Sequence, residues 1–178
     1  MNITFCAVNL FTDRERLVAM DRSFVTDRIF RVSRTPFSFT LEETLVDPPL
    51  RKHLPLEDDL GEQRAWDEGL VAESDGEIVG FAAWKHERWN RRTVLWHLYV
   101  APSFRGLGTG RRLSDAVIGD ARSARMRCVW LETSSVNYPA ITFYRRLGFA
   151  LCGLDMSLYD PAGPATSETA LYFTYPLE

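Results

Sequence analysis

Three glycines between positions 106 and 110 mark the stretch of this chain with the clearest chemical meaning. Before them, an apolar run from Val94 to Val100 is rich in branched and aromatic residues and predicts a buried strand, which Pro102 ends. After them, apolar residues at helical spacing over 111–121 predict a helix. Glycines let a turn expose successive backbone N–H groups, and a helix N-terminus adds partial positive charge. The stretch therefore predicts a phosphate-binding loop.

Two common phosphate-binding motifs do not fit this loop. A dinucleotide-binding fingerprint would need a third glycine at position 111, where the chain has Arg111. A nucleotide-triphosphate loop ends in Gly-Lys-Ser or Gly-Lys-Thr, and the sequence contains neither triplet. What remains is Arg-x-x-Gly-x-Gly from Arg105 to Gly110, after a strand that ends in Val-Ala-Pro. A plain glycine-rich loop is the alternative.

A second motif, Asn-x-x-Ala-x-x-x-Tyr-x-x-x-Gly-Phe, runs from Asn137 to Phe149. By itself it predicts a helix that Asn137 caps, with Pro139 in its first turn and Gly148 at its end. In this order, the two motifs resemble those of the GNAT superfamily of acetyl-CoA-dependent N-acyltransferases. The resemblance implies an α/β (α+β) GNAT fold, with a mixed central sheet of about six to seven strands, helices on both faces and a splayed central strand pair that binds acetyl-CoA. It covers the C-terminal half of the fold, and we expect one domain over residues 1–178.

The resemblance also implies how the reaction proceeds. A neutral amine attacks the thioester carbonyl of acetyl-CoA directly, without an acyl-enzyme and without a metal. Tyr144 aligns with the family's usual general acid, and its phenol could protonate the departing thiolate; packing on the helix is the alternative role. The residues implied to bind the cofactor, by backbone or side chain, are Leu98, Tyr99, Val100, Arg105, Gly106, Leu107, Gly108, Thr109, Gly110, Arg111, Asn137 and Tyr144.

The general base is less clearly marked. A protonated lysine-type amine has a pKa of about 10.4, so it must lose a proton before it attacks. His97 titrates near neutrality and should point to the face of the strand opposite Leu98. It is therefore the candidate base, with a purely structural role as the alternative. Asp21, Asp155 or a chain of water molecules are the other candidates.

The flanking segments resemble a narrower group, the streptothricin acetyltransferases. Those enzymes acetylate the β-lysine amine of streptothricin antibiotics and so inactivate them. The segments that carry the resemblance are 20–26, 47–50, 89–92, 152–160 and 168–172. By position, the resemblance implies that the acceptor is surrounded by Asp21, Phe24, Trp89, Asn90, Asp155 and Tyr159.

One departure from that group concerns charge. Its members carry acidic residues on the central strand, where this chain has His97 and Tyr99, so a less cationic amine is a possible acceptor. Two other functions remain open: a protein N-terminal or lysine acetyltransferase, and a non-catalytic module that senses acyl-CoA. Turnover would separate the sensor from an enzyme, whereas binding would not.

Composition excludes several partner classes. The chain has 178 residues, 46% of them hydrophobic, and a formal net charge of −3, which predicts a globular protein that does not bind nucleic acid. No apolar run reaches membrane-spanning length and no signal peptide is apparent, so we expect a cytoplasmic protein. Either a monomer or a homodimer fits the sequence, which carries no signal for the oligomeric state. Cys6 and Cys128 lie in apolar runs and are predicted to be buried thiols. His53, His86 and His97 have no metal-ligand spacing.

The remaining elements are predicted from local signals. Thr12 and Glu15 form a capping box for a helix ending near Phe24, after a strand over 3–8. Asp75-Gly76 predicts a type I′ hairpin between strands 69–74 and 77–84, and Asp47-Pro48-Pro49 should break any regular element. Acidic residues over 57–68 indicate a solvated loop or an acidic rim for a polycationic substrate. Further strands are expected over 126–132, 149–154 and 170–176.

Overall fold

The computed structural model describes residues 2–160, 162 and 168–177. In chain order, the elements over these residues are β1 (Thr4–Ala7), α1 (Leu10–Ala19), β2 (Phe24–Arg34), β3 (Phe39–Lys52), η1 (Glu57–Leu60), β4 (Glu68–Ser74), β5 (Glu77–Glu87), β6 (Arg92–Val100), η2 (Pro102–Phe104), α2 (Thr109–Ser123), β7 (Cys128–Ser134), α3 (Tyr138–Leu147), β8 (Ala150–Asp155) and β9 (Ala170–Pro176). Seven strands form a sheet in the order β1-β4-β5-β6-β7-β9-β8, and β2 and β3 form a two-stranded sheet. The α/β fold with a mixed sheet is therefore confirmed.

The chain divides into two compact units. The first consists of Met1–Ser23, His53–Trp130 and Pro176–Glu178, and the second of Phe24–Lys52 and Leu131–Tyr175. Strand β7 begins in the first unit and ends in the second.

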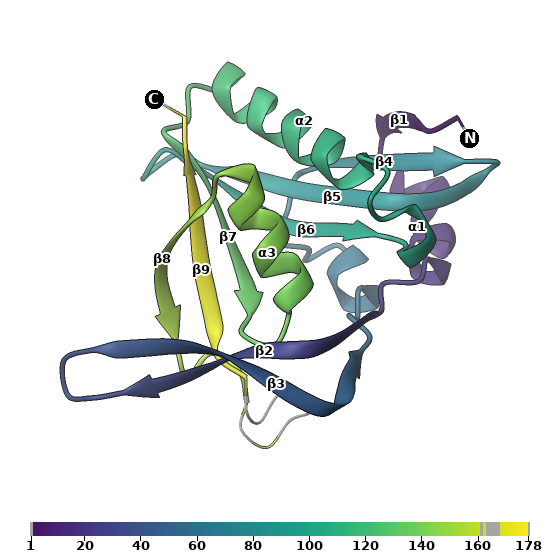
Figure 1. Ribbon diagram of the computed structural model, residues 1–178. Coiled ribbons are helices and arrows are strands. Elements are labelled where there is room, and N and C mark those ends of the chain that lie inside the picture. Colours follow the sequence, from purple (N-terminus) through teal and green to yellow (C-terminus); the bar gives the residue numbers. More distant parts are fainter. Residues whose placement is uncertain (1, 161, 163–167, 178) are drawn as a thin grey trace. The chain divides into compact units, whose positions relative to one another are not determined.

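Strand β5 is the centre of the first unit because both of its faces are covered. Its residues are buried almost continuously, as expected for a strand between two layers. On one face, Phe81 and Ala83 join a hydrophobic core with Leu17 and Met20 at the end of α1. On the other, Gly80 leaves no room for a side chain: an added Cβ would lie 3.1 Å from Leu113 of α2. Helix α2 packs mainly against β5 and β6 (Figure 1).

The hairpin and the strand–loop–helix of this unit form as their sequences predict. Asp75 and Gly76 have φ of 51° and 82°, and Ser74 pairs with Glu77, so the turn between β4 and β5 has the left-handed backbone of a type I′ turn. Strand β6 covers the predicted run, and α2 follows the glycines over Thr109–Ser123.

Two predictions for the N-terminal segment are wrong. The cap of α1 is Asn9, three residues before the predicted cap Thr12, because Asn9 accepts from the N–H of Phe11 and its own N–H donates to Asp13. It ends at Ala19, and Phe24 already belongs to β2. Cys6 is exposed because β1 pairs only with β4 at the edge of the sheet, whereas Cys128 is buried as predicted.

In the second unit, β2 and β3 pair as a long antiparallel ribbon (Figure 1). The predicted break at Asp47-Pro48-Pro49 is wrong, since these residues lie inside β3. The ladder accommodates them by a register shift: Thr26 pairs with Leu50, but Arg28 pairs with Leu45. The prolines thus fall in a bulge, where no ladder hydrogen bond from their nitrogens is needed. Strands β8 and β9 and helix α3 form where predicted.

Candidate active site

The glycine loop of the first unit has the backbone that an anion site needs. Gly106 and Gly108 have φ of 77° and 85°, and Gly108 caps α2 without a side-chain hydrogen bond. A Cβ at either glycine would meet nothing within 4 Å, so the left-handed backbone, not space, requires glycine here. The first N–H groups of α2 have no partner within the helix. They are directed out of the N-terminal end of α2, which is also the positive end of the helix dipole.

Arg105 fixes this loop to its surroundings. Its Nε donates to the carbonyl of Val100 at 2.9 Å, and its Nη2 donates to the carbonyl of Ser23 at 2.6 Å. Burial lowers the pKa of Arg105, and the nearby carboxylate of Asp21 opposes that effect. The loop is therefore tied to the end of β6 before any ligand binds. The carbonyl of Val100, which the family resemblance implies for the pantetheine arm, already accepts from Arg105.

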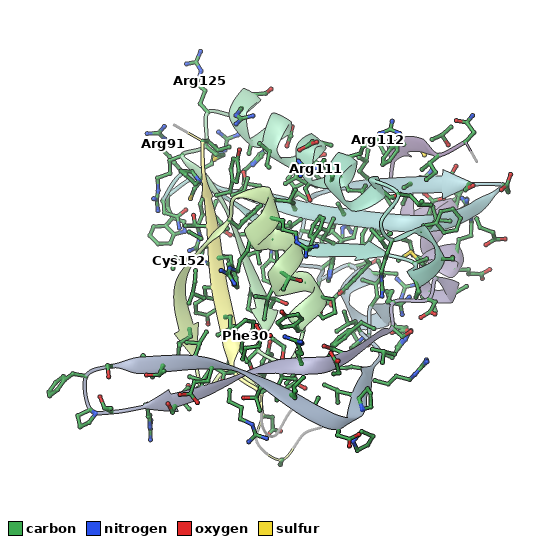
Figure 2. All side chains as sticks on the ribbon, in the orientation of Figure 1. Phe30, Arg91, Arg111, Arg112, Arg125 and Cys152 are labelled. Atoms are coloured by element: carbon green, nitrogen blue, oxygen red, sulfur yellow. The ribbon has the colours of Figure 1, made fainter. Side chains whose placement is uncertain are left out.

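Two arginines follow on the first turn of α2, and both are labelled in Figure 2. The Arg112 guanidinium lies 4.0 Å from the ring centroid of Phe5, a cation–π contact. Arg111 is exposed, so it can turn toward a phosphate without losing a buried contact. Thr109 is buried, and its hydroxyl has no hydrogen-bond partner among the described residues.

A bulge in β6 orients the residues of the central strand. Ala83 of β5 pairs with His97, but the next residue of β5, Trp84, pairs with Leu95, which leaves Trp96 as the extra residue. Beyond the bulge, His97 and Tyr99 share one face of the strand. The imidazole stacks at 5.9 Å on Phe81. His97 is consequently only 6% exposed.

His97 lies between a hydroxyl and a carboxylate. Its Nδ1 is 3.2 Å from the hydroxyl oxygen of Tyr99, and its Nε2 is 3.8 Å from Oδ2 of Asp59 on η1. Burial lowers the pKa of His97 to about 4, and the charge of Arg22 adds to that effect. Burial, with Asp58 adding to it, raises the pKa of Asp59. The imidazole is therefore neutral near pH 7, and it can pass a proton on more readily than it can keep one.

The two other candidate bases are held in tight turns. Oδ1 of Asp21 accepts from the N–H of Ser23 at 2.8 Å, and Oδ1 of Asp155 accepts from the hydroxyl of Ser157 at 2.6 Å and from its N–H at 2.7 Å. These hydrogen bonds lower the pKa of both carboxyl groups. A lower pKa makes a weaker base, so the geometry favours neither residue for removing a proton from an amine.

In the second unit, α3 presents Asn137 and Tyr144. Oδ1 of Asn137 accepts from the N–H of Ala140 at 3.3 Å, and Gly148 ends the helix with φ of 99°, which confirms the predicted cap and stop. Tyr144 is 7% exposed, and its ring packs against Phe149 and Phe173 at centroid distances of 5.7 and 6.5 Å. The aromatic ring is thus fixed by packing.

A polar cluster in the same unit was not predicted from the sequence. The hydroxyl of Tyr159 donates to Oε1 of Glu132 on β7. Glu168 accepts from Lys52 and from the hydroxyl of Ser134, each at 2.5 Å. Burial raises the pKa of Glu132, and the charge of Glu168 adds to the rise. In the sequence, the signal for this cluster is the end of the apolar run on β7, where polar residues alternate with buried ones.

The residues implied for the acceptor are distributed over both units. Trp89 and Asn90 share the turn after β5, where Trp89 is 82% exposed and Asn90 accepts from the N–H of Arg92 at 3.2 Å. Asp21 follows α1 in the same unit. In the second unit, Phe24 is a buried residue of β2, and Asp155 is the last residue of β8. Tyr159 follows β8 in the chain and donates to Glu132, as described above.

Residues 29–149 match the acetyltransferase (GNAT) family. The chain belongs to the GNAT family of acetyltransferases. It is 40% identical over 172 residues to the streptothricin acetyltransferase of Streptomyces lavendulae, and this match covers 92% of this chain and 90% of the relative. It is 29% identical over 153 residues to the streptothricin acetyltransferase of Escherichia coli, with 86% and 85% covered.

Solved structures agree with this family assignment. A nourseothricin acetyltransferase has a TM-score of 0.90 and 40% identity, with all of both chains covered. A Bacillus anthracis protein solved in complex with acetyl coenzyme A has a TM-score of 0.78 over 98% of this chain and 99% of its own, and its 22% identity shows a shared fold.

Over 2–160, 162 and 168–177, no helix is long and apolar enough to cross a membrane. Within the same residues, no three His, Cys, Asp or Glu side chains are grouped as a metal site.

Proposed function

We propose that this N-acetyltransferase transfers the acetyl group of acetyl-CoA to an amine of a streptothricin-type antibiotic and so inactivates it. The observation that carries the proposal is the 40% identity to a streptothricin acetyltransferase over nearly the whole of both chains. The similarity is not limited to the acetyl-CoA motifs, since it includes the segments on either side of them. The nourseothricin acetyltransferase, equally similar in sequence and alike in structure over its full length, supports the same acceptor class.

In this proposal, the pyrophosphate of acetyl-CoA binds the loop from Gly106 to Arg111. Support comes from the two left-handed glycines, the start of α2 and the hydrogen bonds of Arg105 that hold the loop in place. The neutral amine forms a bond to the thioester carbon, and the carbon–sulfur bond breaks. Tyr144 gives its proton to the departing thiolate, the attacking nitrogen loses one proton as it becomes the amide, and that proton restores the phenol of Tyr144 directly or through water. The role of Tyr144 rests on its place in the second motif, and Asn137 contacts the pantetheine arm.

The cluster at Glu132 supports a cationic acceptor. It contains two carboxylates, Glu132 and Glu168, and one ammonium, Lys52, which is engaged with Glu168. Glu132 accepts a hydrogen bond from the neutral hydroxyl of Tyr159, and the nearby positive charge that acts on it, that of Lys52, is shared with Glu168. A partly buried carboxylate without a full counter-charge gains when a cation binds it. A polycationic antibiotic offers such a cation, whereas a neutral amine does not.

The test is release of free thiol from acetyl-CoA by the purified protein. Streptothricin is compared with a panel of small amines and peptides, and the product masses are read from the same reactions. Rapid release with a gain of one acetyl group on streptothricin is the expected result. Release only with peptides would replace the proposal with protein acetylation. Tight acetyl-CoA binding without release for any acceptor would indicate a sensor.

A further inference from the structure

Three side chains of the first unit form a line from strand β6 to the acidic segment at η1. The Tyr99 hydroxyl is 3.2 Å from Nδ1 of His97, and Nε2 of His97 is 3.8 Å from Oδ2 of Asp59. The three differ in their access to solvent. His97 is enclosed and Tyr99 is half-buried, whereas the side chain of Asp59 is 57% exposed.

The line has a direction. A neutral imidazole donates through one ring nitrogen and accepts through the other. The carboxylate of Asp59 favours the proton on Nε2, which leaves Nδ1 to accept from the hydroxyl of Tyr99. The 3.8 Å gap is longer than a hydrogen bond, and the exposed Asp59 side chain can close it by a small movement or through one water.

We propose that Tyr99, His97 and Asp59 carry the proton of the acceptor amine from strand β6 to solvent, with the Tyr99 hydroxyl as the group that meets the amine. The proposal rests on the proposed function, because it concerns the same acyl transfer. Tyr99 is the catalytic residue of this relay, and His97 and Asp59 act through it as positioning residues.

An amine that arrives as an ammonium ion must lose one proton before it can attack the thioester. The ammonium gives one proton to the oxygen of Tyr99 while the hydroxyl proton of Tyr99 moves to Nδ1 of His97. The proton on Nε2 moves to Asp59 and then to water. Each group ends with the number of protons it had at the start, apart from a change of tautomer at His97 that reverses when the relay resets. The neutral amine then attacks the thioester.

Burial and charge explain why the histidine conducts the proton and does not hold it. His97 faces the Arg22 guanidinium, the Asp59 carboxylate and the Tyr99 hydroxyl, and its pKa of about 4 means that an imidazolium is disfavoured. Arg22 stays in place because it donates to the carbonyls of Leu17 and Met20, and Glu57 and His53 also face it. The pKa of Asp59 is raised by burial, with Asp58 adding to it, which improves Asp59 as the receiver.

The first test needs no turnover. Nitrogen chemical shifts of the labelled, intact protein report which ring nitrogen of His97 carries the proton. We expect the Nε2–H form from about pH 8 down to about pH 5, with protonation only near pH 4. In the Tyr99→Phe variant, the Nδ1 shift should move toward that of a nitrogen without a hydrogen bond. A proton on Nδ1 in the wild type would overturn the relay, because Nδ1 could then not accept from Tyr99.

The second test is kinetic. Tyr99→Phe and His97→Gln should each lower kcat about a hundredfold, while KM for acetyl-CoA stays within about twofold. Asp59→Asn should lower kcat less and shift the acid limb of the pH profile. His86→Gln is the matched control, since His86 also bonds a hydroxyl and a carboxylate, those of Thr93 and Asp120, yet lies outside the line. Equal losses in the control and in His97→Gln would overturn the relay.

These outcomes separate the relay from the proposed function. If the wild-type protein acetylates no amine at all, the proposed function fails, and the nitrogen shifts still decide whether the Tyr99–His97 contact has the required direction. If the wild type is active and Tyr99→Phe keeps full kcat while its fold is unchanged, the relay fails and the acetyltransferase proposal stands.

Discussion

Gly108 lies where the loop meets α2, with φ of 85° and ψ of −6°, and its replacement by alanine tests the account of the phosphate loop. A Cβ there would meet nothing within 4 Å. The substitution therefore adds no steric clash with a neighbour, and its effect comes from the backbone alone. A left-handed conformation costs an alanine about 1–2 kcal/mol more than it costs a glycine.

The same helix offers a control. Gly119 lies inside α2, and a Cβ there would also meet nothing within 4 Å, but its φ is not left-handed. Gly119→Ala should therefore raise the free energy of unfolding by about 0.5–1 kcal/mol, because alanine favours a helix interior. Gly108→Ala should lower it, by up to about 1–2 kcal/mol. Opposite signs from the same chemical change would isolate the backbone effect.

Ligand binding should respond in the same way. Acetyl-CoA requires the left-handed conformation, so any part of the cost of about 1–2 kcal/mol that the free variant avoids by relaxing returns on binding, where it raises Kd by up to about thirtyfold. Urea unfolding measures the stabilities, and titration calorimetry measures acetyl-CoA affinity. Unchanged stability together with an unchanged Kd in Gly108→Ala, with Gly119→Ala as reference, would refute the reasoning that the left-handed glycine shapes the phosphate site.

Three further predictions concern charge and proton transfer. Glu132→Gln should raise KM for a cationic acceptor about tenfold or more and leave acetyl-CoA affinity unchanged in calorimetry; an unaltered KM would remove Glu132 from acceptor binding. Tyr144→Phe should lower kcat more than acetyl-CoA affinity, and an unchanged rate of thiol release would exclude Tyr144 as the acid. The pKa of His97 is about 4 in the fold against 6.5 for an unperturbed histidine, so the unfolded chain binds the proton more readily and stability falls as the pH drops below 6.5. Between about pH 7 and about pH 5, the free energy of unfolding of the wild type should fall by about 2 kcal/mol through His97, and the His97→Gln variant should not show this fall. Urea unfolding at each pH measures it, and equal losses in both proteins would contradict the burial of a neutral imidazole.

The parts of the fold that the sequence predicts well are those set by local chemistry. Asp75-Gly76 demands left-handed backbone at two consecutive residues, and only a narrow class of turns provides it. Asn137 and Gly148 delimit α3 because a side-chain oxygen and a residue with positive φ satisfy the two ends of a helix. The strand–glycine–helix order is equally local.

The errors have tertiary or competing local causes. Asn9 and Asp13 form a cap that begins the helix before Thr12 can. The prolines at 48 and 49 continue β3 because the pairing with β2 shifts register around them, which no single-strand pattern reveals. The exposure of Cys6 depends on the place of β1 at the sheet edge.

In the candidate site, too, the features set by local sequence were predictable, and those set by distant contacts were not. The residues of the glycine loop were evident from spacing, since their function is carried by the backbone. The Glu132–Tyr159 pair and the His97–Asp59 pair join residues 27 and 38 positions apart in the sequence. Their pKa changes depend on burial and on these distant partners, so residue type alone could not predict them.

Acetylation of a streptothricin-type antibiotic on an amine is most directly tested by tandem mass spectrometry of the product that the purified protein forms from acetyl-CoA and streptothricin, with the Tyr144→Phe variant in parallel. We expect one added acetyl group, located on the β-lysine part, and much less product with the variant. Streptothricin recovered unmodified, while a peptide or another small amine in the same reaction gains the acetyl group, would contradict it.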